Sequence, residues 1–160
     1  MPMYNIGFSE KLIEAGNAII KDDRASADAR RAVLYLSLLS SEITLKALLE
    51  KAGVDVKIIK KRSHRLHELL SDIGKCKIPV KIGNSKRWAS ANRIRSILVD
   101  KRYRNATVGH LLEANKIGLS KYPDEIRYGD KLFHYPPLMM LKAATKSLEW
   151  AKEHWETIRI

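Results

Sequence analysis

The sequence predicts an all-α fold: an up-down bundle of about five to six helices that forms a single domain over residues 1–160. Three observations lead to this prediction. Apolar residues recur at helical spacing in several segments, strand-like alternation is weak throughout, and the 8 glycines and 5 prolines are too few for a collagen-like or disordered chain. A chain of 160 residues can bury most of its apolar surface in one core. We expect the two long helices, one near each terminus, to pack antiparallel.

The first half of the chain contains the better-marked helices. One is expected to follow Ser9, because the apolar residues beyond it can share one side of a helix. The next is long, covering about 26–51, and Gly53 stands just past its end as a left-handed cap. A basic connection with a short apolar patch follows. Ser63 then reads as the N-cap of a short helix that ends at Gly74.

The second half is less regular. Residues 75–84 alternate weakly, but a proline and a glycine there favour an irregular connection. A helix is expected from 85 towards 103, and a short one around 111–112. After a loop of about eighteen residues, the last helix opens with Pro137 in its first turn and continues to the C-terminus.

The positive charge is concentrated in one third of the chain. The net charge is +12, and residues 51–104, here called the basic third, hold 16 basic against 4 acidic side chains. The rest of the chain is close to neutral. Such a distribution favours a polyanion such as RNA or a nucleotide, although a merely solvated face or attraction to anionic lipid gives the same pattern. The residues expected to hold a phosphate backbone are Lys86, Arg87, Arg95, Lys101 and Arg102.

Several classes of protein are excluded by what the sequence lacks. The single cysteine, Cys76, implies no disulfide framework, and the first residues do not resemble a secretory signal. With no apolar run of membrane-spanning length, we expect a soluble, cytoplasmic protein without membrane contact. The sequence lacks the motifs of kinases, dehydrogenases, α/β-hydrolases and zinc proteases, and we expect no cofactor. His64 and His67 have a spacing that can ligate a metal, but no third ligand is placed to complete a site, so no metal is expected.

Two expected helices carry distinctive patterns: Glu-x-x-x-Lys-Ala-Leu-Leu in SSEITLKALLEKAG at 40–53, and His-x-Leu-x-x-Leu-Leu in SHRLHELLSDI at 63–73. Through these patterns the chain resembles the HEPN family (higher eukaryotes and prokaryotes nucleotide-binding). The resemblance implies a helical bundle that usually forms a homodimer. Many members are metal-independent ribonucleases, and others accompany a separate nucleotidyltransferase.

The family's catalytic signature is an Arg followed, after four to six residues, by a His. This chain offers Arg104-Asn105 followed by His110, and a second pair in Arg127 and His134. The resemblance favours the first pair, because an Arg-Asn opening is typical of ribonuclease members, whereas Arg-Tyr is typical of those beside nucleotidyltransferases.

The chemistry of these residue types suits RNA cleavage. Histidine exchanges protons near neutral pH, and arginine binds a phosphate through two parallel hydrogen bonds. We therefore expect His110 to act as acid or base, Arg104 to clamp phosphate and Asn105 to orient it, with two such pairs meeting at a dimer groove. Glu42 either orients this motif from inside the bundle or forms a surface ion pair with Lys46.

Two other functions stay open at this point. The chain could be a non-catalytic module that binds nucleotide or nucleic acid, or that partners a nucleotidyltransferase in a toxin–antitoxin or defence system. It could also be an interaction bundle whose basic face is incidental, in which Arg104 is one more surface cation and His110 a capping or core residue.

Overall fold

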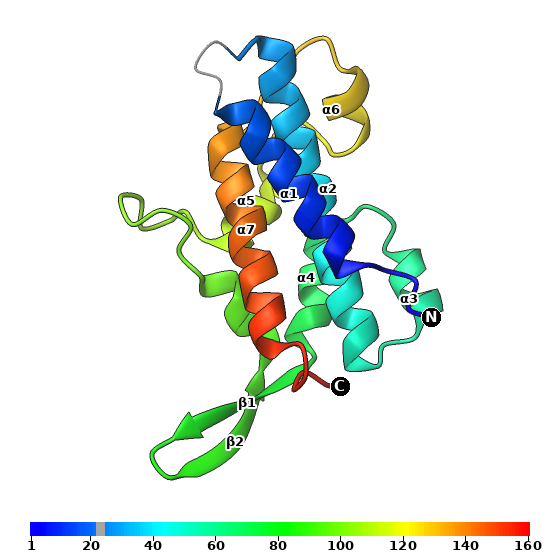
Figure 1. The fold of residues 1–160 in the computed structure, drawn as a ribbon, viewed down its shortest axis with the longest axis vertical. Helices are drawn as coiled ribbons and strands as arrows, with labels where there is room; N and C mark the ends of the chain where they lie inside the picture. The colour runs from blue at the N-terminus through cyan, green and yellow to red at the C-terminus, as the bar shows by residue number, and fades with distance from the viewer. Residues whose placement is uncertain (22–24) are drawn as a thin grey trace.

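Three long helices run side by side along the longest axis of the molecule and form its scaffold (Figure 1). They are α1 (Ile6–Ile20), α2 (Ala27–Ala52) and α7 (Pro137–His154). The computed structural model describes residues 1–21 and 25–160. The shorter elements between α2 and α7 are α3 (Val56–Lys61), α4 (Leu66–Gly74), β1 (Lys77–Ile82), β2 (Ser85–Ser90), the 3-10 helix η1 (Ala91–Ser96), α5 (Val108–Leu112), the 3-10 helix η2 (Ala114–Ile117) and α6 (Asp124–Tyr128). The expected helical class is confirmed in outline only, because a two-stranded sheet is also present.

Side-chain caps set where the first two helices begin. The Asn5 side chain accepts hydrogen bonds from backbone N–H groups of the first turn, so α1 begins before Ser9 rather than after it. Ser26 caps α2 in the same way. Gly53 ends α2 with a φ of +100°, a left-handed conformation that glycine adopts without strain. The predicted range of the second helix, 26–51, therefore matches α2 closely.

The expected antiparallel packing of the two long helices is wrong, because α2 and α7 run parallel (Figure 1). Val33, early in α2, packs in the same cluster as Leu141, early in α7. At the far ends, Lys51 Nζ lies 3.3 Å from Glu156 Oε2, just beyond α7. The helix that runs antiparallel to both is α1. The elements from α3 to α6 carry the chain back to the end where α2 begins, so α7 starts there in the same direction.

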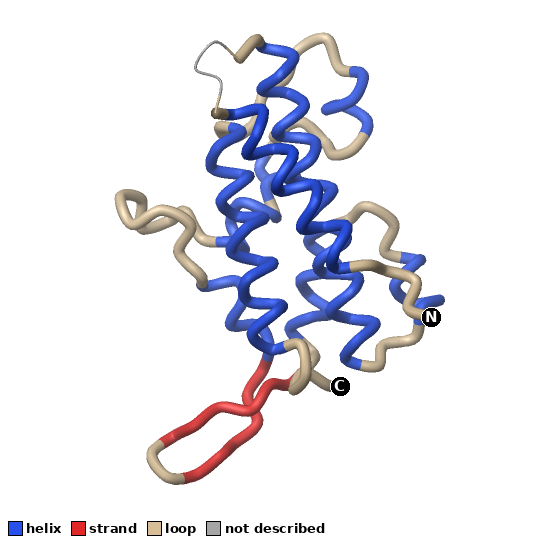
Figure 2. Tube along the Cα trace, in the orientation of Figure 1, coloured by secondary structure: helices blue, strands red, loops and turns tan. Residues whose placement is uncertain are grey.

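Residues 75–103 differ most from the expectation. Instead of an irregular connection over 75–84 and a helix from 85 onward, β1 and β2 form an antiparallel hairpin that projects from the bundle (red in Figure 2). Its turn contains Gly83 with a φ of +61°, which suits a two-residue hairpin loop. The helix η1 follows directly, and 97–107 is irregular. The basic residues of this region are therefore spread over a hairpin, a 3-10 helix and a loop, not along one helix face.

Three other segments also differ, by less, from the predicted elements. The apolar patch after α2 forms α3, capped by the Asp55 side chain, where a plain connection was expected. Ser63 does not cap the next helix; it adopts a φ of +50°, and α4 begins at Leu66. The last helix ends at His154, and the long loop before it contains η2 and α6.

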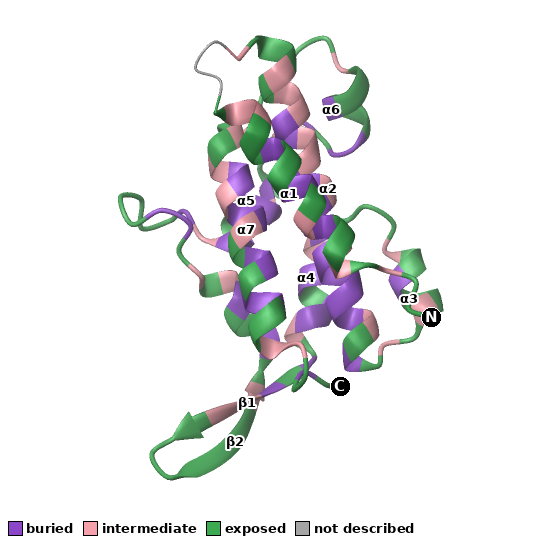
Figure 3. Cartoon of the chain, in the orientation of Figure 1, coloured by how far each residue is buried: buried purple, intermediate pink, exposed green. Residues whose placement is uncertain are grey.

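The main core lies between α2, α4, α5 and α7 (purple in Figure 3). Among its largest fully buried side chains are Leu45, Leu48 and Leu49 of α2. By length and composition α2 could cross a membrane, but 72% of its most apolar stretch is buried inside the fold. A core helix of a soluble protein shows this burial, which is consistent with the soluble protein we expected.

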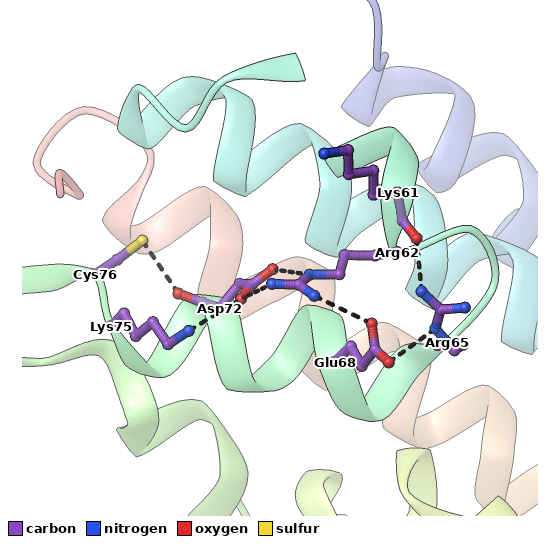
Figure 4. A network of polar contacts seen from close by, with 7 residues as sticks. All are labelled: Lys61, Arg62, Arg65, Glu68, Asp72, Lys75 and Cys76. Carbon is purple, nitrogen blue, oxygen red and sulfur yellow. Dashed lines mark hydrogen bonds and ion pairs between the residues drawn. The ribbon is translucent and has the colours of Figure 1, made fainter. Parts of the chain in front are cut away.

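Arg62 fixes the turn between α3 and α4 (Figure 4). Its guanidinium donates from Nε to Asp72 Oδ2 at 2.7 Å and from Nη2 to Asp72 Oδ1 at 3.1 Å. A third hydrogen bond joins Arg62 Nη1 to Glu68 Oε2 at 3.3 Å. Because Asp72 is buried, this two-pronged ion pair ties the end of α3 to the last turn of α4. Arg62 thus stabilises the fold, although it belongs to the basic third of the sequence.

Candidate functional site

The short helix α5 places His110 beside η1, and it confirms the helix expected around 111–112. The Thr107 hydroxyl caps α5 by accepting a hydrogen bond from the His110 backbone N–H at 3.2 Å. Gly109 lets α5 approach η1 closely, because a Cβ at this position would lie 2.9 Å from the Cβ of Arg95. The position of His110 is therefore set by a cap and a close backbone contact.

The His110 side chain is exposed and is held by Tyr135, which lies just before α7. The His110 Nε2 is 2.6 Å from the Tyr135 hydroxyl oxygen. Burial raises the pKa of Tyr135, so the hydroxyl keeps its proton at neutral pH. The hydroxyl can donate to an unprotonated Nε2 or accept from a protonated one. The hydrogen bond therefore holds the imidazole through Nε2 in both protonation states, and Nδ1 is the ring nitrogen left to exchange a proton with a ligand.

His110 opens on a cavity with a volume of about 470 Å³. The cavity brings together two of the predicted catalytic residues, Asn105 and His110. Arg104 is exposed on the same loop and is not among the described residues that line the cavity. Arg102, which we expected to bind a phosphate backbone, lines it instead, together with Lys142 from α7.

Asp100 gathers two cations at this cavity. Its nearly buried carboxylate accepts hydrogen bonds from Arg102, Nε to Oδ1 at 3.1 Å and Nη2 to Oδ2 at 2.9 Å, and Lys142 Nζ lies 3.6 Å from Oδ2. These hydrogen bonds from the Arg102 guanidinium hold the pKa of Asp100 well below its usual range, so the carboxylate stays charged. One anion and two cations leave an excess of positive charge, which suits a phosphate group.

The second predicted pair, Arg127 and His134, is held by separate partners. Arg127 Nε donates to the Tyr35 hydroxyl at 2.9 Å, and its guanidinium lies 5.1 Å from the centre of that ring. His134 Nδ1 accepts from the backbone N–H of Tyr135 at 2.9 Å. His134 also lines a different cavity, of about 710 Å³, whose described lining residues do not include Arg127. Burial lowers the pKa of His134, which disfavours its charged form.

Glu42 is directed inward, but it does not contact either Arg…His pair among the described residues. Its carboxylate is nearly buried and binds Lys46 Nζ at 2.7 Å. The other oxygen lies 2.9 Å from His64 Nδ1 and accepts a hydrogen bond from the Tyr122 hydroxyl at 2.6 Å. The alternative of a surface ion pair is wrong, and the histidine that Glu42 orients is His64.

His64 is therefore a candidate site residue that was not among those predicted from the sequence. Its side chain is 48% exposed and, with His67, Lys116, Lys121 and Tyr122, lines a cavity of about 390 Å³. Burial and the Glu42 charge raise the pKa of Tyr122, so its hydroxyl remains a donor. The available signal was the resemblance itself, because Glu42 and His64 both lie in its matching segments.

The five residues predicted to bind a phosphate backbone are separated in the structure. Lys86 and Arg87 are exposed on β2, and Lys101 and Arg102 are exposed on the loop after η1. Arg95 is half-buried in η1 and forms an ion pair with Glu113. The exposed members of this set therefore lie in two places, the hairpin and the loop. Of the five, Arg102 on the loop is among the described residues that line the His110 cavity.

Within the described residues, no group of three His, Cys, Asp or Glu side chains is placed to hold a metal ion. In the comparisons with known proteins, no family model, no curated protein and no solved structure matches this chain.

Proposed function

We propose that this chain is a HEPN-like domain that binds RNA and cleaves it, without a metal ion, at the His110 cavity. One observation carries the proposal. An exposed imidazole, held by Tyr135, opens on the same cavity as Asn105, Arg102 and Lys142. A group that transfers protons and groups that bind phosphate thus lie together at the edge of the basic third.

The reaction that these groups suit is an internal transesterification. His110 takes the proton of a ribose 2′-hydroxyl on Nδ1, because Nε2 is engaged by Tyr135, and the 2′-oxygen forms a bond to the adjacent phosphorus. The bond from phosphorus to the 5′-oxygen breaks, and that oxygen takes up a proton. Arg102 and Lys142 stabilise the added negative charge on the phosphoryl oxygens, and Asn105 orients one of them. The products are a 2′,3′-cyclic phosphate and a 5′-hydroxyl end.

A single imidazole cannot accept and donate a proton in the same step. The resemblance implies a homodimer, and a second copy facing the same groove supplies the second imidazole. This arrangement is part of the proposal, and it predicts that cleavage follows the concentration of dimer rather than that of the chain.

A second candidate active site for the same reaction is His64. The observation that favours it is the hydrogen bond from His64 Nδ1 to the buried Glu42 carboxylate. A carboxylate in this position fixes the orientation of the ring. Lys116 and Lys121 line the same cavity and supply positive charge for a phosphate.

The test is incubation of a labelled, unstructured RNA with the full chain in excess chelator. We expect cleavage to a 2′,3′-cyclic phosphate by the wild type and loss of cleavage in His110→Ala. Loss in His64→Ala alone would move the active site to the Glu42 cavity. His154→Gln is the control, because His154 packs against Trp150 in α7 and lines neither cavity among the described residues. Absence of cleavage by the wild-type dimer would refute the enzymatic proposal. Binding that weakens steeply with salt would then support the non-catalytic alternative.

A further inference from the structure

We propose that one face of the β1–β2 hairpin is a platform for single-stranded RNA, where a base stacks on Trp88 and lysines hold the adjoining phosphates. This inference rests on RNA being the ligand under the proposed function, and it names the form of RNA. It concerns a surface that is separate from the His110 cavity, to whose described lining the hairpin contributes no residue.

The register of the hairpin decides which side chains share a face. Directly opposite residues of an antiparallel pair point to the same side, and alternate residues along a strand point to opposite sides. Pro79 pairs with Trp88, and Lys81 pairs with Lys86, two residues along each strand. These four side chains therefore lie on one face. At the base of the hairpin the other face is closed by Ile78, which is buried in the main core, and by Val80, which packs against that core, whereas Trp88 on the first face remains exposed.

The charges on the hairpin lack internal compensation. Residues 77–90 contain four basic side chains and no acidic one. Lys81 and Lys86 are both exposed and lie directly across from each other, an arrangement of like charges that destabilises a strand pair. A polyanion that binds between them relieves this repulsion and releases its own counterions. The hairpin also projects away from the bundle, where a strand can reach it (Figure 1).

Trp88 is held in place on one face of its ring and remains partly exposed. Its side chain is 46% exposed, and the Arg159 guanidinium carbon lies 3.4 Å from the centre of its ring. Arg159 is fixed in turn by two backbone hydrogen bonds to Lys77, at 2.7 and 3.0 Å, which add the C-terminal segment beside β1. The indole is therefore supported by a stacked cation, and its exposed part can accept a base in continuation of that stack.

The geometry favours an unpaired strand over a duplex. Stacking needs the flat face of a base, and in a duplex those faces are occupied by neighbouring bases. The major groove of an RNA duplex is also too deep and narrow for side chains to reach the bases. Aromatic rings with nearby cations are the usual means of binding single strands with little sequence preference. We therefore assign single-stranded RNA as the ligand, and duplex RNA is the comparison.

The experiment measures binding of the full chain to a fluorescently labelled 12-nucleotide 2′-O-methyl oligouridine and to a 12-base-pair duplex with the same modification, by anisotropy over a range of salt concentrations. The blocked 2′-oxygen prevents cleavage during the measurement. We expect Trp88→Ala to weaken binding of the single strand by about 5- to 150-fold, with little effect on the duplex. Trp88→Phe should restore most of the loss. Lys81→Ala should lower the slope of log affinity against log salt by roughly 0.7. The matched controls are Phe8→Ala and Lys57→Ala, which remove an exposed ring on α1 and an exposed lysine on α3.

A second readout reports the stacking itself. Oligouridine should quench the tryptophan emission of the wild type, and the quenching should be lost in Trp88→Phe, which keeps Trp150 and Trp155. Inorganic polyphosphate at equal charge should leave the emission unchanged. Equal losses for single strand and duplex in Trp88→Ala, or no loss for either, would overturn the platform while leaving cleavage at His110 intact. Conversely, a wild type that binds oligouridine through Trp88 without cleaving RNA would support the platform and refute the nuclease.

Discussion

Removing the buried carboxylate of Glu42 should strongly destabilise the fold. Three groups depend on it: the Lys46 ammonium at 2.7 Å, the Tyr122 hydroxyl at 2.6 Å and His64 Nδ1 at 2.9 Å. Their surroundings differ. The Lys46 side chain is 10% exposed and Tyr122 is buried, whereas the His64 side chain is 48% exposed. The substitution Glu42→Leu removes the carboxylate, and water can replace it only at His64.

The size of the effect follows from the two groups left without a partner. An uncompensated buried charge at Lys46 costs about 3–5 kcal/mol. An unsatisfied hydroxyl at Tyr122 costs about 1–3 kcal/mol. Together they lower the free energy of unfolding by about 4–8 kcal/mol, a large share of the stability of an ordinary domain. The cost should then be recovered in steps. Adding Lys46→Leu restores about 3–5 kcal/mol, and adding Tyr122→Phe restores about 1–3 kcal/mol.

Urea unfolding at 25 °C, followed by circular dichroism, measures each step. With a slope of about 2 kcal/mol/M, Glu42→Leu should lower the midpoint by about 2–4 M. The matched control is Glu14→Leu, which breaks the exposed Lys11–Glu14 pair of α1 and should leave the midpoint unchanged. If the double variant Glu42→Leu/Lys46→Leu has the same urea midpoint as Glu42→Leu, the prediction is wrong. The Lys46 ammonium would then have found another partner or reached water.

Three further predictions concern the sites and their supports. His110→Ala should slow RNA cleavage by about 10²- to 10⁴-fold and leave the affinity for oligouridine, measured by anisotropy, unchanged. Equal losses in cleavage rate and in affinity would show that His110 acts in binding instead. Gly109→Ala should lower the free energy of unfolding by about 1–3 kcal/mol in thermal or urea unfolding, because its Cβ would press against Arg95; an unchanged value would show that η1 gives way freely. Burial lowers the pKa of His134, so the unfolded state binds this proton more readily than the folded state. The free energy of unfolding should therefore fall as the pH drops through about 6.5, and His134→Asn should flatten that dependence in urea unfolding at several pH values; an identical pH dependence in the variant would contradict this.

The elements predicted best are those whose signals are local. α2 has an N-cap at Ser26, apolar residues at helical spacing and a glycine at its end, and its range was predicted closely. The hairpin was missed because its alternation is short and Pro79 interrupts it. The following residues, which include Trp88 and Ile94, also fit a helical spacing. The turn Gly83–Asn84 was the signal that could have decided between them.

The site was predictable only where its residues are close in the sequence. His110 and Asn105 lie within one motif and do line one cavity. Their support by Tyr135 depends on how the loop before α7 returns to α5, which spacing along the chain does not reveal. The same holds for Glu42, whose partner Tyr122 lies 80 residues away.

The parallel arrangement of α2 and α7 also has a consequence for how the chain folds. α1 and α2 are joined by a short segment and can pair early, because closing a small loop costs little entropy. The contacts between α2 and α7 can form only after the whole region between these helices has come together. Their formation is therefore the slow, long-range step of folding. Until that step, the side of α2 that α7 covers stays open to water. Substitutions on that side of α7 should therefore slow refolding as well as speed unfolding.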